Sequence, residues 1–347
     1  RDSSAGVSGE KQYRQSSVPA AVARASSRSA IRSCRASLDM VRPNKLAAFF
    51  RFNLRFRDPR MPSPRPAPRL ILCAATWSMI GHPSFQRSWN ATRRLRAMRD
   101  AGFDGVYTEV TPALAREARR LGLVLTGGLA APDFATGRKF LCAQARAGTP
   151  LINVHLLRHD TPAAAAARAA ARLVKLGRSL GVIVQFETHR DTATETPEKF
   201  SELARVYRRA TGEDLPVTWD HSHFAVVKHL QPPDYARRLL AWPRLIRASR
   251  MFHLRPFTGQ HCQAPVTDAR GRLTPEFRTY LDFVEQLFAC WLAGPRPGNA
   301  LHAVPEMGMT HGYQLSTARH AWPESVRAAR EIRRVWRRAL ARSSGQA

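Results

Sequence analysis

Residues 182–187 read Val-Ile-Val-Gln-Phe-Glu, a short apolar run of β-strand type that ends in a carboxylate. Three later runs repeat this pattern, each followed by a residue that can bind a metal: 216–219 before Asp220, 249–252 before His253, and 301–305 before Glu306. The four polar residues are separated by 33, 33 and 53 positions. The first two gaps match the length of one strand–helix unit, so the spacing predicts a parallel α/β fold.

The chain from residue 70 onward alternates between strand-like and helix-like segments with short connections. The predicted strands are 70–77, 105–110, 124–129, 151–156, 182–188, 217–220, 249–254 and 301–306. Thr-Pro pairs at 161–162, 196–197 and 274–275 mark the starts of three helices between them. This alternation predicts an α/β protein built as a (β/α)₈ TIM barrel over residues 69–345. A doubly wound open sheet fits less well, because no G-x-G-x-x-G follows the first strand.

The barrel prediction brings the four polar residues together. Side chains at the C-terminal ends of barrel strands converge on one mouth, where the chemistry of such folds takes place. Each residue alone is as well explained by a buried ion pair or hydrogen bond. Together, Glu187, Asp220, His253 and Glu306 offer three carboxylates and one imidazole, and they predict a site for one divalent metal ion. Such ligands suit Mn²⁺, Mg²⁺, Co²⁺ or Zn²⁺, with no thiolate that would require zinc.

Residues 1–68 differ from the rest of the chain. They are rich in Ser, Arg, Ala and Pro and show no sustained periodicity, which predicts a disordered basic extension. Residues 1–60 alone contain 13 Lys and Arg against 4 Asp and Glu. Two interpretations stay open: an upstream extension of a protein that starts at Met61, or a basic targeting peptide.

The formal net charge of +29 over 347 residues is large enough to raise the question of a nucleic-acid partner. Most of the charge, however, is carried by arginines spread along the polar faces of predicted helices. A solvated Arg-rich surface is therefore the simplest explanation, and attraction for a phosphorylated sugar stays open. We expect no nucleic-acid partner.

The remaining composition indicates a protein of the cytoplasm. No apolar stretch approaches the roughly 18 residues that a membrane span requires, so we expect no membrane partner. The five cysteines are scattered and form no C-x-x-C pair, which favours a reducing compartment over a disulfide framework. The sequence leaves the formation of a homo-oligomer open.

Residues 70–325 resemble the sugar phosphate isomerase/epimerase family, whose members are xylose isomerase-like barrels. The residues that carry the resemblance are Thr76-Trp77-Ser78, Asn153-Val-His155, Glu187-Thr-His189-Arg190, Asp220-His-Ser-His223, His253-Leu-Arg255 and Val304-Pro-Glu306. The resemblance implies that Glu187, Asp220, His253 and Glu306 bind one divalent metal ion. It also implies that Glu187 and Glu306 serve as catalytic residues.

The chemistry of such a site is proton abstraction next to a carbonyl of a sugar or polyol. One carboxylate removes the proton and the other returns it through an enediolate, so Glu187 and Glu306 form the predicted acid–base pair. Return to the same carbon gives an epimerase, and return to the neighbouring carbon gives an aldose–ketose isomerase. The predicted substrate-binding residues are Trp77, His155, His189, His223 and Arg255, the last through a bidentate contact with a carboxylate or phosphate.

Two other activities share these residues. A dehydratase of an inosose- or dehydroshikimate-like substrate has the same ligand set. An endonuclease IV-like nuclease for abasic sites would give the positive charge a role, but its three-metal cluster requires a D-x-H after the strand-7 histidine. In this chain Asp268 is followed by Ala269 and Arg270. The isomerase or epimerase is therefore the preferred prediction.

Overall fold

The protein is described by a computed structural model, which covers residues 67–309 and 320–345. The predicted disordered extension, residues 1–68, lies outside these residues except for its last two positions. Residues 310–319 lie outside them as well.

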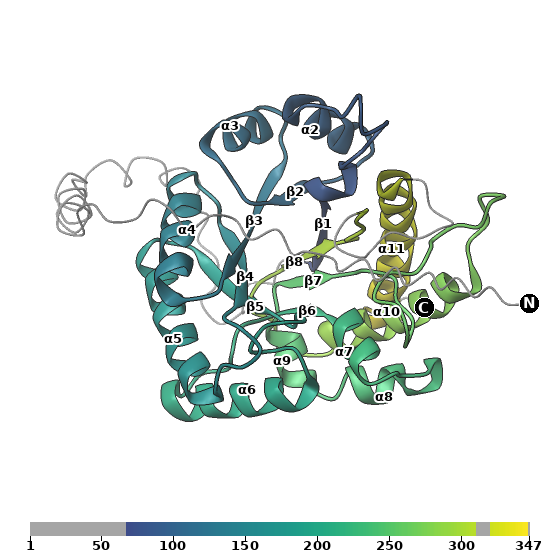
Figure 1. The fold of residues 1–347 in the computed structure, drawn as a ribbon. Coiled ribbons are helices and arrows are strands. Elements are labelled where there is room, and N and C mark those ends of the chain that lie inside the picture. Colours follow the sequence, from purple (N-terminus) through teal and green to yellow (C-terminus); the bar gives the residue numbers. More distant parts are fainter. Residues whose placement is uncertain (1–66, 310–319, 346–347) are drawn as a thin grey trace, which may run out of the picture. The chain divides into compact units, whose positions relative to one another are not determined.

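The described residues form a closed barrel of eight parallel strands in the order β1 to β8, with the helices outside (Figure 1). The strands are β1 (Arg69–Ala75), β2 (Gly105–Thr108), β3 (Val124–Ala131), β4 (Leu151–Leu156), β5 (Ile183–Glu187), β6 (Val217–Asp220), β7 (Met251–His253) and β8 (Ala300–Val304). The longer helices are α2 (Ala91–Asp100), α3 (Pro112–Arg120), α4 (Phe134–Arg146), α5 (Ala163–Ser179), α6 (Pro197–Thr211), α10 (Pro275–Leu292) and α11 (Ala321–Ser343). The predicted (β/α)₈ barrel is confirmed.

Several predicted details are wrong: β1 and β2 end two residues earlier than predicted, at Ala75 and Thr108, and β7 starts two residues later, at Met251. The connection from β6 to β7 is not one helix but the short helices α7 (His221–Val227), α8 (Tyr235–Leu239) and α9 (Pro243–Ala248), with a 3₁₀ turn at Pro232–Asp234. The prolines interrupt the helical hydrogen bonding in this segment. Strand β8 ends at Val304, two residues earlier than predicted, because Pro305 has no N–H to donate to the ladder.

Helix starts follow the Thr-Pro signal in two of three cases. Thr196 and Thr274 cap α6 and α10, accepting hydrogen bonds from Lys199 N (3.3 Å) and Phe277 N (3.2 Å). At the third pair, α5 begins at Ala163 without a side-chain cap. There Pro162 occupies the N-cap position, so Thr161 lies one residue before the position from which its side chain could cap the helix.

Strict alternation of side chains along the strands separates the core from the site. In β5 and β6, Val184, Phe186, Val217 and Trp219 belong to the large apolar cluster between strands and helices. Their neighbours in sequence point to the barrel interior, because successive residues of a strand face opposite sides. In β5, β6 and β7 the inward register therefore ends in a polar side chain, whereas in β8 it ends in Val304 and Glu306 follows two residues later.

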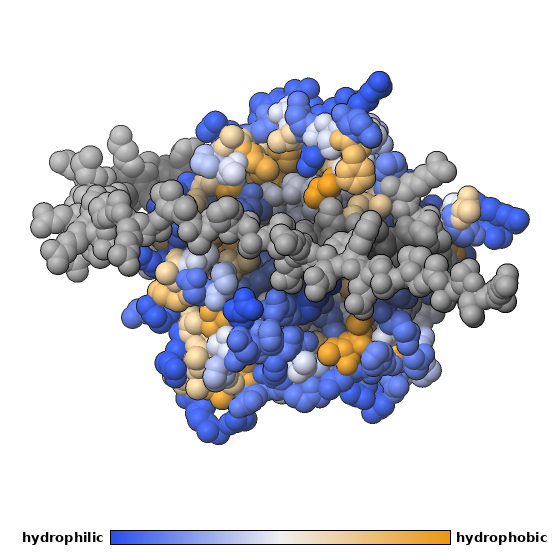
Figure 2. Space-filling model, viewed as in Figure 1, coloured by the Kyte–Doolittle hydropathy of each residue, from blue (hydrophilic) through white to orange (hydrophobic). Residues whose placement is uncertain are grey.

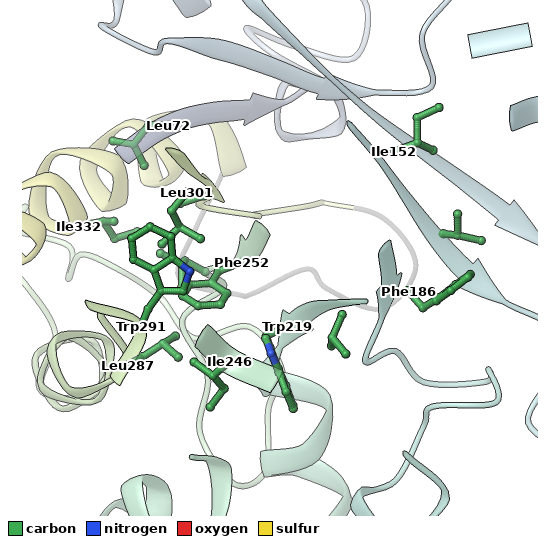
Figure 3. Close-up of a cluster of buried hydrophobic side chains, with 14 of the residues drawn as sticks. Leu72, Ile152, Phe186, Trp219, Ile246, Phe252, Leu287, Trp291, Leu301 and Ile332 are labelled. Carbon is green, nitrogen blue, oxygen red and sulfur yellow. The ribbon is translucent and has the colours of Figure 1, made fainter. Parts of the chain in front are cut away.

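The outer core is completed by α10 and α11. Figure 3 shows Trp291 and Leu287 of α10 beside Phe252 of β7 and Leu301 of β8. The indole N–H of Trp291 donates to Ser249 O at 2.9 Å, so the one polar atom of this ring has a partner. These contacts hold β7 and β8, the two strands that lead to His253 and Glu306.

The surface of the described residues is mostly hydrophilic on the side shown in Figure 2. Several of its arginines pair with carboxylates, including Arg120 with Glu117 (2.7 Å) and Arg338 with Glu285 (2.6 Å). Exposed pairs of this kind contribute little stability but balance charge locally. In the described part of the chain no helix is long and apolar enough to cross a lipid bilayer.

Replacing Leu287 by alanine is expected to lower the free energy of unfolding by about 3 kcal/mol, because a fully buried side chain leaves a cavity. Gln286→Ala, on the exposed side of the same helix, is the control and should change stability by less than about 0.5 kcal/mol. Urea unfolding followed by circular dichroism measures both. Equal effects of the two substitutions would contradict the placement of this helix.

Candidate metal centre

The four predicted ligands meet at the C-terminal mouth of the barrel. Glu187, Asp220 and His253 are the last residues of β5, β6 and β7, and Glu306 lies two residues beyond the end of β8. All four are buried, with exposed fractions of 8% or less. One ligand atom from each residue lies within 4.8 Å of those from the other three. These four ligand atoms are close enough together to surround one metal ion.

His253 stands between the two glutamates. Its Nδ1 lies 2.9 Å from Oε1 of Glu187 and 3.0 Å from Oε2 of Glu306. The guanidinium of Arg255 lies on the other side of Glu306, 2.8 Å from Oε2, and 3.4 Å from Oδ2 of Asp220. In this cluster three carboxylates therefore lie in contact with one imidazole, that of His253, and one guanidinium, that of Arg255.

The pKa values of these groups follow from burial and from their neighbours. Burial lowers the pKa of His253, but Glu187 and Glu306 outweigh it and raise that pKa to about 10. Burial raises the pKa of Glu306, and Arg255 and His253 outweigh it, bringing that pKa to about 2. The pKa of Glu187 is likewise held well below its ordinary value by His253 and His155, against the effect of burial. For Asp220 burial prevails over Arg255, and its pKa rises to about 6.

These residues fit a divalent cation. Oδ2 of Asp220 and Oε2 of Glu306 are buried carboxylate oxygens that share one guanidinium, that of Arg255, at 3.4 and 2.8 Å. Buried carboxylate oxygens are costly without a hydrogen bond or a cation. With His253 neutral, a divalent ion together with Arg255 would balance the three negative charges. The ligand types are those preferred by Mg²⁺, Mn²⁺ and Zn²⁺.

Backbone and hydroxyl contacts fix the ligands from behind. The Oγ1 of Thr188 donates to Asp220 O and accepts from Asp220 N, both at 2.9 Å, which ties the ends of β5 and β6 together. Oδ1 of Asp220 accepts from Ser222 N at 2.9 Å and so caps α7. One oxygen of Asp220 is therefore occupied by the helix cap, and the other points into the cluster.

The sequence did not single out Asn153 and Tyr107 as site residues, although both belong to the site. The side-chain amide of Asn153 donates to Tyr107 Oη at 2.8 Å and to Oε2 of Glu187. The Tyr107 ring lies 4.8 Å from the ring of His253. The signal available was register: Asn153 lies two positions before His155 in β4, so both point inward.

A glycine in β3 makes room for this network. A Cβ placed on Gly128 would lie 2.8 Å from Tyr107 Oη, closer than such atoms approach in proteins. Gly128 therefore leaves β3 without an inward side chain at this level of the barrel. Tyr107 fills the space and reaches Asn153.

The predicted substrate-binding histidines line the same mouth. Nε2 of His155 lies 2.9 Å from Oε2 of Glu187. The ring of His189 stacks on that of His155 with centroids 4.0 Å apart, and His223 follows at 4.4 Å. His155, Glu187 and His189 form a second group of closely spaced donor atoms. Their contact with a substrate stays a prediction.

The other two predicted substrate contacts lie elsewhere in the site. Trp77, half-buried in the 3₁₀ turn Thr76–Met79, packs edge-on against Tyr107 with centroids 5.0 Å apart. Arg255 is 3% exposed and contacts the predicted ligands Asp220 and Glu306. Its contact with a substrate anion stays a prediction that this placement does not favour.

Comparison with known proteins identifies the fold. No protein-family model matches the sequence, and no curated protein matches it. Among solved structures, an L-ribulose 3-epimerase superposes with a TM-score of 0.52 at 13% identity, covering 80% of this chain and 97% of its own. A xylose isomerase domain-containing protein from Salmonella typhimurium LT2 gives 0.51 at 16% identity, covering 78% and 97%.

A D-allulose 3-epimerase from Methylomonas sp. gives a TM-score of 0.50 at 14% identity, over 77% of this chain and 98% of the epimerase. At such identities the likeness concerns the fold. The chain has the fold of the xylose isomerase-like TIM barrels, which confirms the fold that the sequence resemblance implied.

Replacing Asp220 by asparagine is expected to weaken the binding of Mn²⁺ by about 100-fold or more, because a negatively charged ligand is lost while the helix cap is kept. Isothermal titration of the metal-stripped protein measures this. Glu202→Gln, on the exposed surface of α6, is the control. Unchanged Mn²⁺ affinity in the Asp220 variant would exclude this cluster as the metal site.

Proposed function

We propose that the protein is a divalent-metal-dependent isomerase or epimerase of a sugar or sugar phosphate. It acts by proton abstraction next to a carbonyl, with Glu187 and Glu306 as the acid–base pair. The observation that carries this proposal is the placement of these two carboxylates on one buried imidazole, at 2.9 and 3.0 Å, within a four-residue ligand group at a barrel mouth. Two structures of the same fold named as sugar 3-epimerases support the choice of substrate class.

One ion of Mn²⁺, Mg²⁺, Co²⁺ or Zn²⁺, held by Glu187, Asp220, His253 and Glu306, would polarise the substrate carbonyl and so acidify the neighbouring C–H. Asp220 and His253 serve mainly as ligands. Asp220 is fixed by the α7 cap and by Thr188, which leaves it little freedom to follow a moving proton.

The two glutamates have different partners, which suits them to different steps. The Oε2 of Glu187 is held by the amide of Asn153 and by Nε2 of His155. The Oε2 of Glu306 is held by the guanidinium of Arg255. One carboxylate removes the proton and the other returns it, and these partners keep both carboxylates aimed at the reacting carbons.

The histidines and Trp77 would bind the rest of the substrate. His155, His189 and His223 form a continuous wall of stacked or tilted rings beside Glu187, with nitrogen atoms suited to sugar hydroxyls. Trp77 lies in the 3₁₀ turn that follows β1, where it packs edge-on against Tyr107. The proposed partner is therefore a small sugar or polyol.

Incubation in D₂O with a panel of ketoses, aldoses and their phosphates tests proton abstraction directly. The wild-type protein with Mn²⁺ should place deuterium at the carbon next to the carbonyl. Glu187→Gln and Glu306→Gln should each slow this exchange by about 100-fold or more, because each removes a general acid or base. Mass spectrometry of the recovered sugar measures the exchange, with Glu202→Gln as the matched control.

The metal content of each sample is measured in parallel, which separates the loss of the acid or base from the loss of the ion. Exchange that persists in both glutamine variants would contradict the mechanism. Loss of water from a keto-polyol in place of exchange would indicate the dehydratase. Cleavage of abasic DNA with about three metal ions per chain would indicate the nuclease.

A further inference from the structure

A cavity of about 290 Å³ opens beside the metal centre, at the C-terminal ends of β3, β4 and β5. We call it the anion pocket. Its lining includes Pro132, His155, Arg158, His189, Arg190 and Asp191. The size is near the lower end of the range for small-molecule sites.

The anion pocket shares a wall with the metal centre. His155 belongs to its lining and also contacts Oε2 of Glu187 at 2.9 Å. His189, stacked on His155 at 4.0 Å, lines the pocket as well. A sugar whose reacting carbons lie at Glu187 would therefore extend its far end past these two rings into the pocket.

The charged side chains of the lining favour an anion. The residues that line the pocket include two arginines, Arg158 and Arg190, and one acidic residue, Asp191. That carboxylate is already engaged by Nδ1 of His159 at 2.7 Å. Guanidinium groups bind phosphates and carboxylates through paired, charge-assisted hydrogen bonds, which a neutral sugar hydroxyl cannot match.

The loops of the pocket are held in place before any ligand arrives. Leu157 N donates to Ala131 O at 2.8 Å, and Ala193 N donates to Leu156 O at 3.0 Å, so the end of β4 is joined to the end of β3 and to the loop after β5. Leu157 and Asp191 both adopt the left-handed backbone region, with φ of 53° and 55°. Strained non-glycine residues concentrate at binding sites, where the surrounding structure enforces them.

We propose that the anion pocket binds an anionic group at the far end of the sugar substrate, a phosphate ester or a carboxylate, through Arg158 and Arg190. This inference rests on the proposed function for the position of the reacting carbons. It assigns the anion contact to these two residues and not to Arg255, whose guanidinium contacts Glu306 and Asp220.

Titration with inorganic phosphate tests the pocket without any turnover. At roughly physiological ionic strength, which screens diffuse attraction to the basic surface, Arg158→Gln and Arg190→Gln should each weaken phosphate binding by about tenfold. Arg209→Gln, at the exposed end of α6, removes the same charge elsewhere and should bind phosphate like the wild type. Phosphate binding that is absent, or equal in all three variants, overturns the proposal.

The deuterium-exchange panel then identifies the anion. Faster exchange with phosphorylated sugars than with neutral sugars indicates a phosphate ester, and faster exchange with sugar acids indicates a carboxylate.

In either case Arg158→Gln and Arg190→Gln should raise KM about tenfold for the anionic substrate while the Arg209 variant matches the wild type. Exchange with neutral sugars alone overturns the proposal. A protein that exchanges no substrate refutes the proposed function, while the phosphate titration still decides on the pocket.

Discussion

The site depends on one electrostatic constraint: three carboxylates are held within 4.8 Å of one another at a buried position. Such a group cannot exist uncompensated in a medium of low polarity, because the desolvation and mutual repulsion of the charges are both unfavourable. In this protein His253 and Arg255 supply two positive charges, and the high pKa of His253 is the direct result. A divalent ion in place of the His253 proton completes the balance. The geometry of the glutamates and the orientation of Arg255 follow from this constraint, and the proposed metal binding would satisfy it.

The barrel creates the constraint through backbone geometry alone. Alternation along the strands sends apolar residues such as Phe186 and Trp219 outward and their neighbours Glu187 and Asp220 inward. Closure of the sheet brings the ends of β5 to β8 to one mouth. The outer core that packs against β7 and β8 therefore helps to position His253 and Glu306, together with the contacts of these two residues.

The strands and the ligand group could be predicted from the sequence because both follow from short, local patterns. Two apolar runs end in the carboxylates Glu187 and Asp220, which are 33 residues apart. This pattern indicates two parallel strands and shows which of their side chains point inward. The roles of Tyr107 and Arg255 could not be predicted in this way, whereas the register of Asn153 already indicates that its side chain points inward. Tyr107 reaches Asn153 only because Gly128, on a different strand, carries no side chain. Arg255 lies beyond the end of β7, where no periodicity indicates whether a guanidinium faces a substrate or the ligands.

We propose that Glu187, Asp220, His253 and Glu306 together hold one divalent ion at the barrel mouth. Anomalous diffraction from crystals grown with Mn²⁺ tests it most directly, because the manganese signal locates the ion without reference to activity. We expect one strong anomalous peak roughly 2–2.5 Å from a donor atom of each of the four residues. A peak at His155 and His189 alone, or no peak at the mouth in a protein that has bound Mn²⁺, would contradict it.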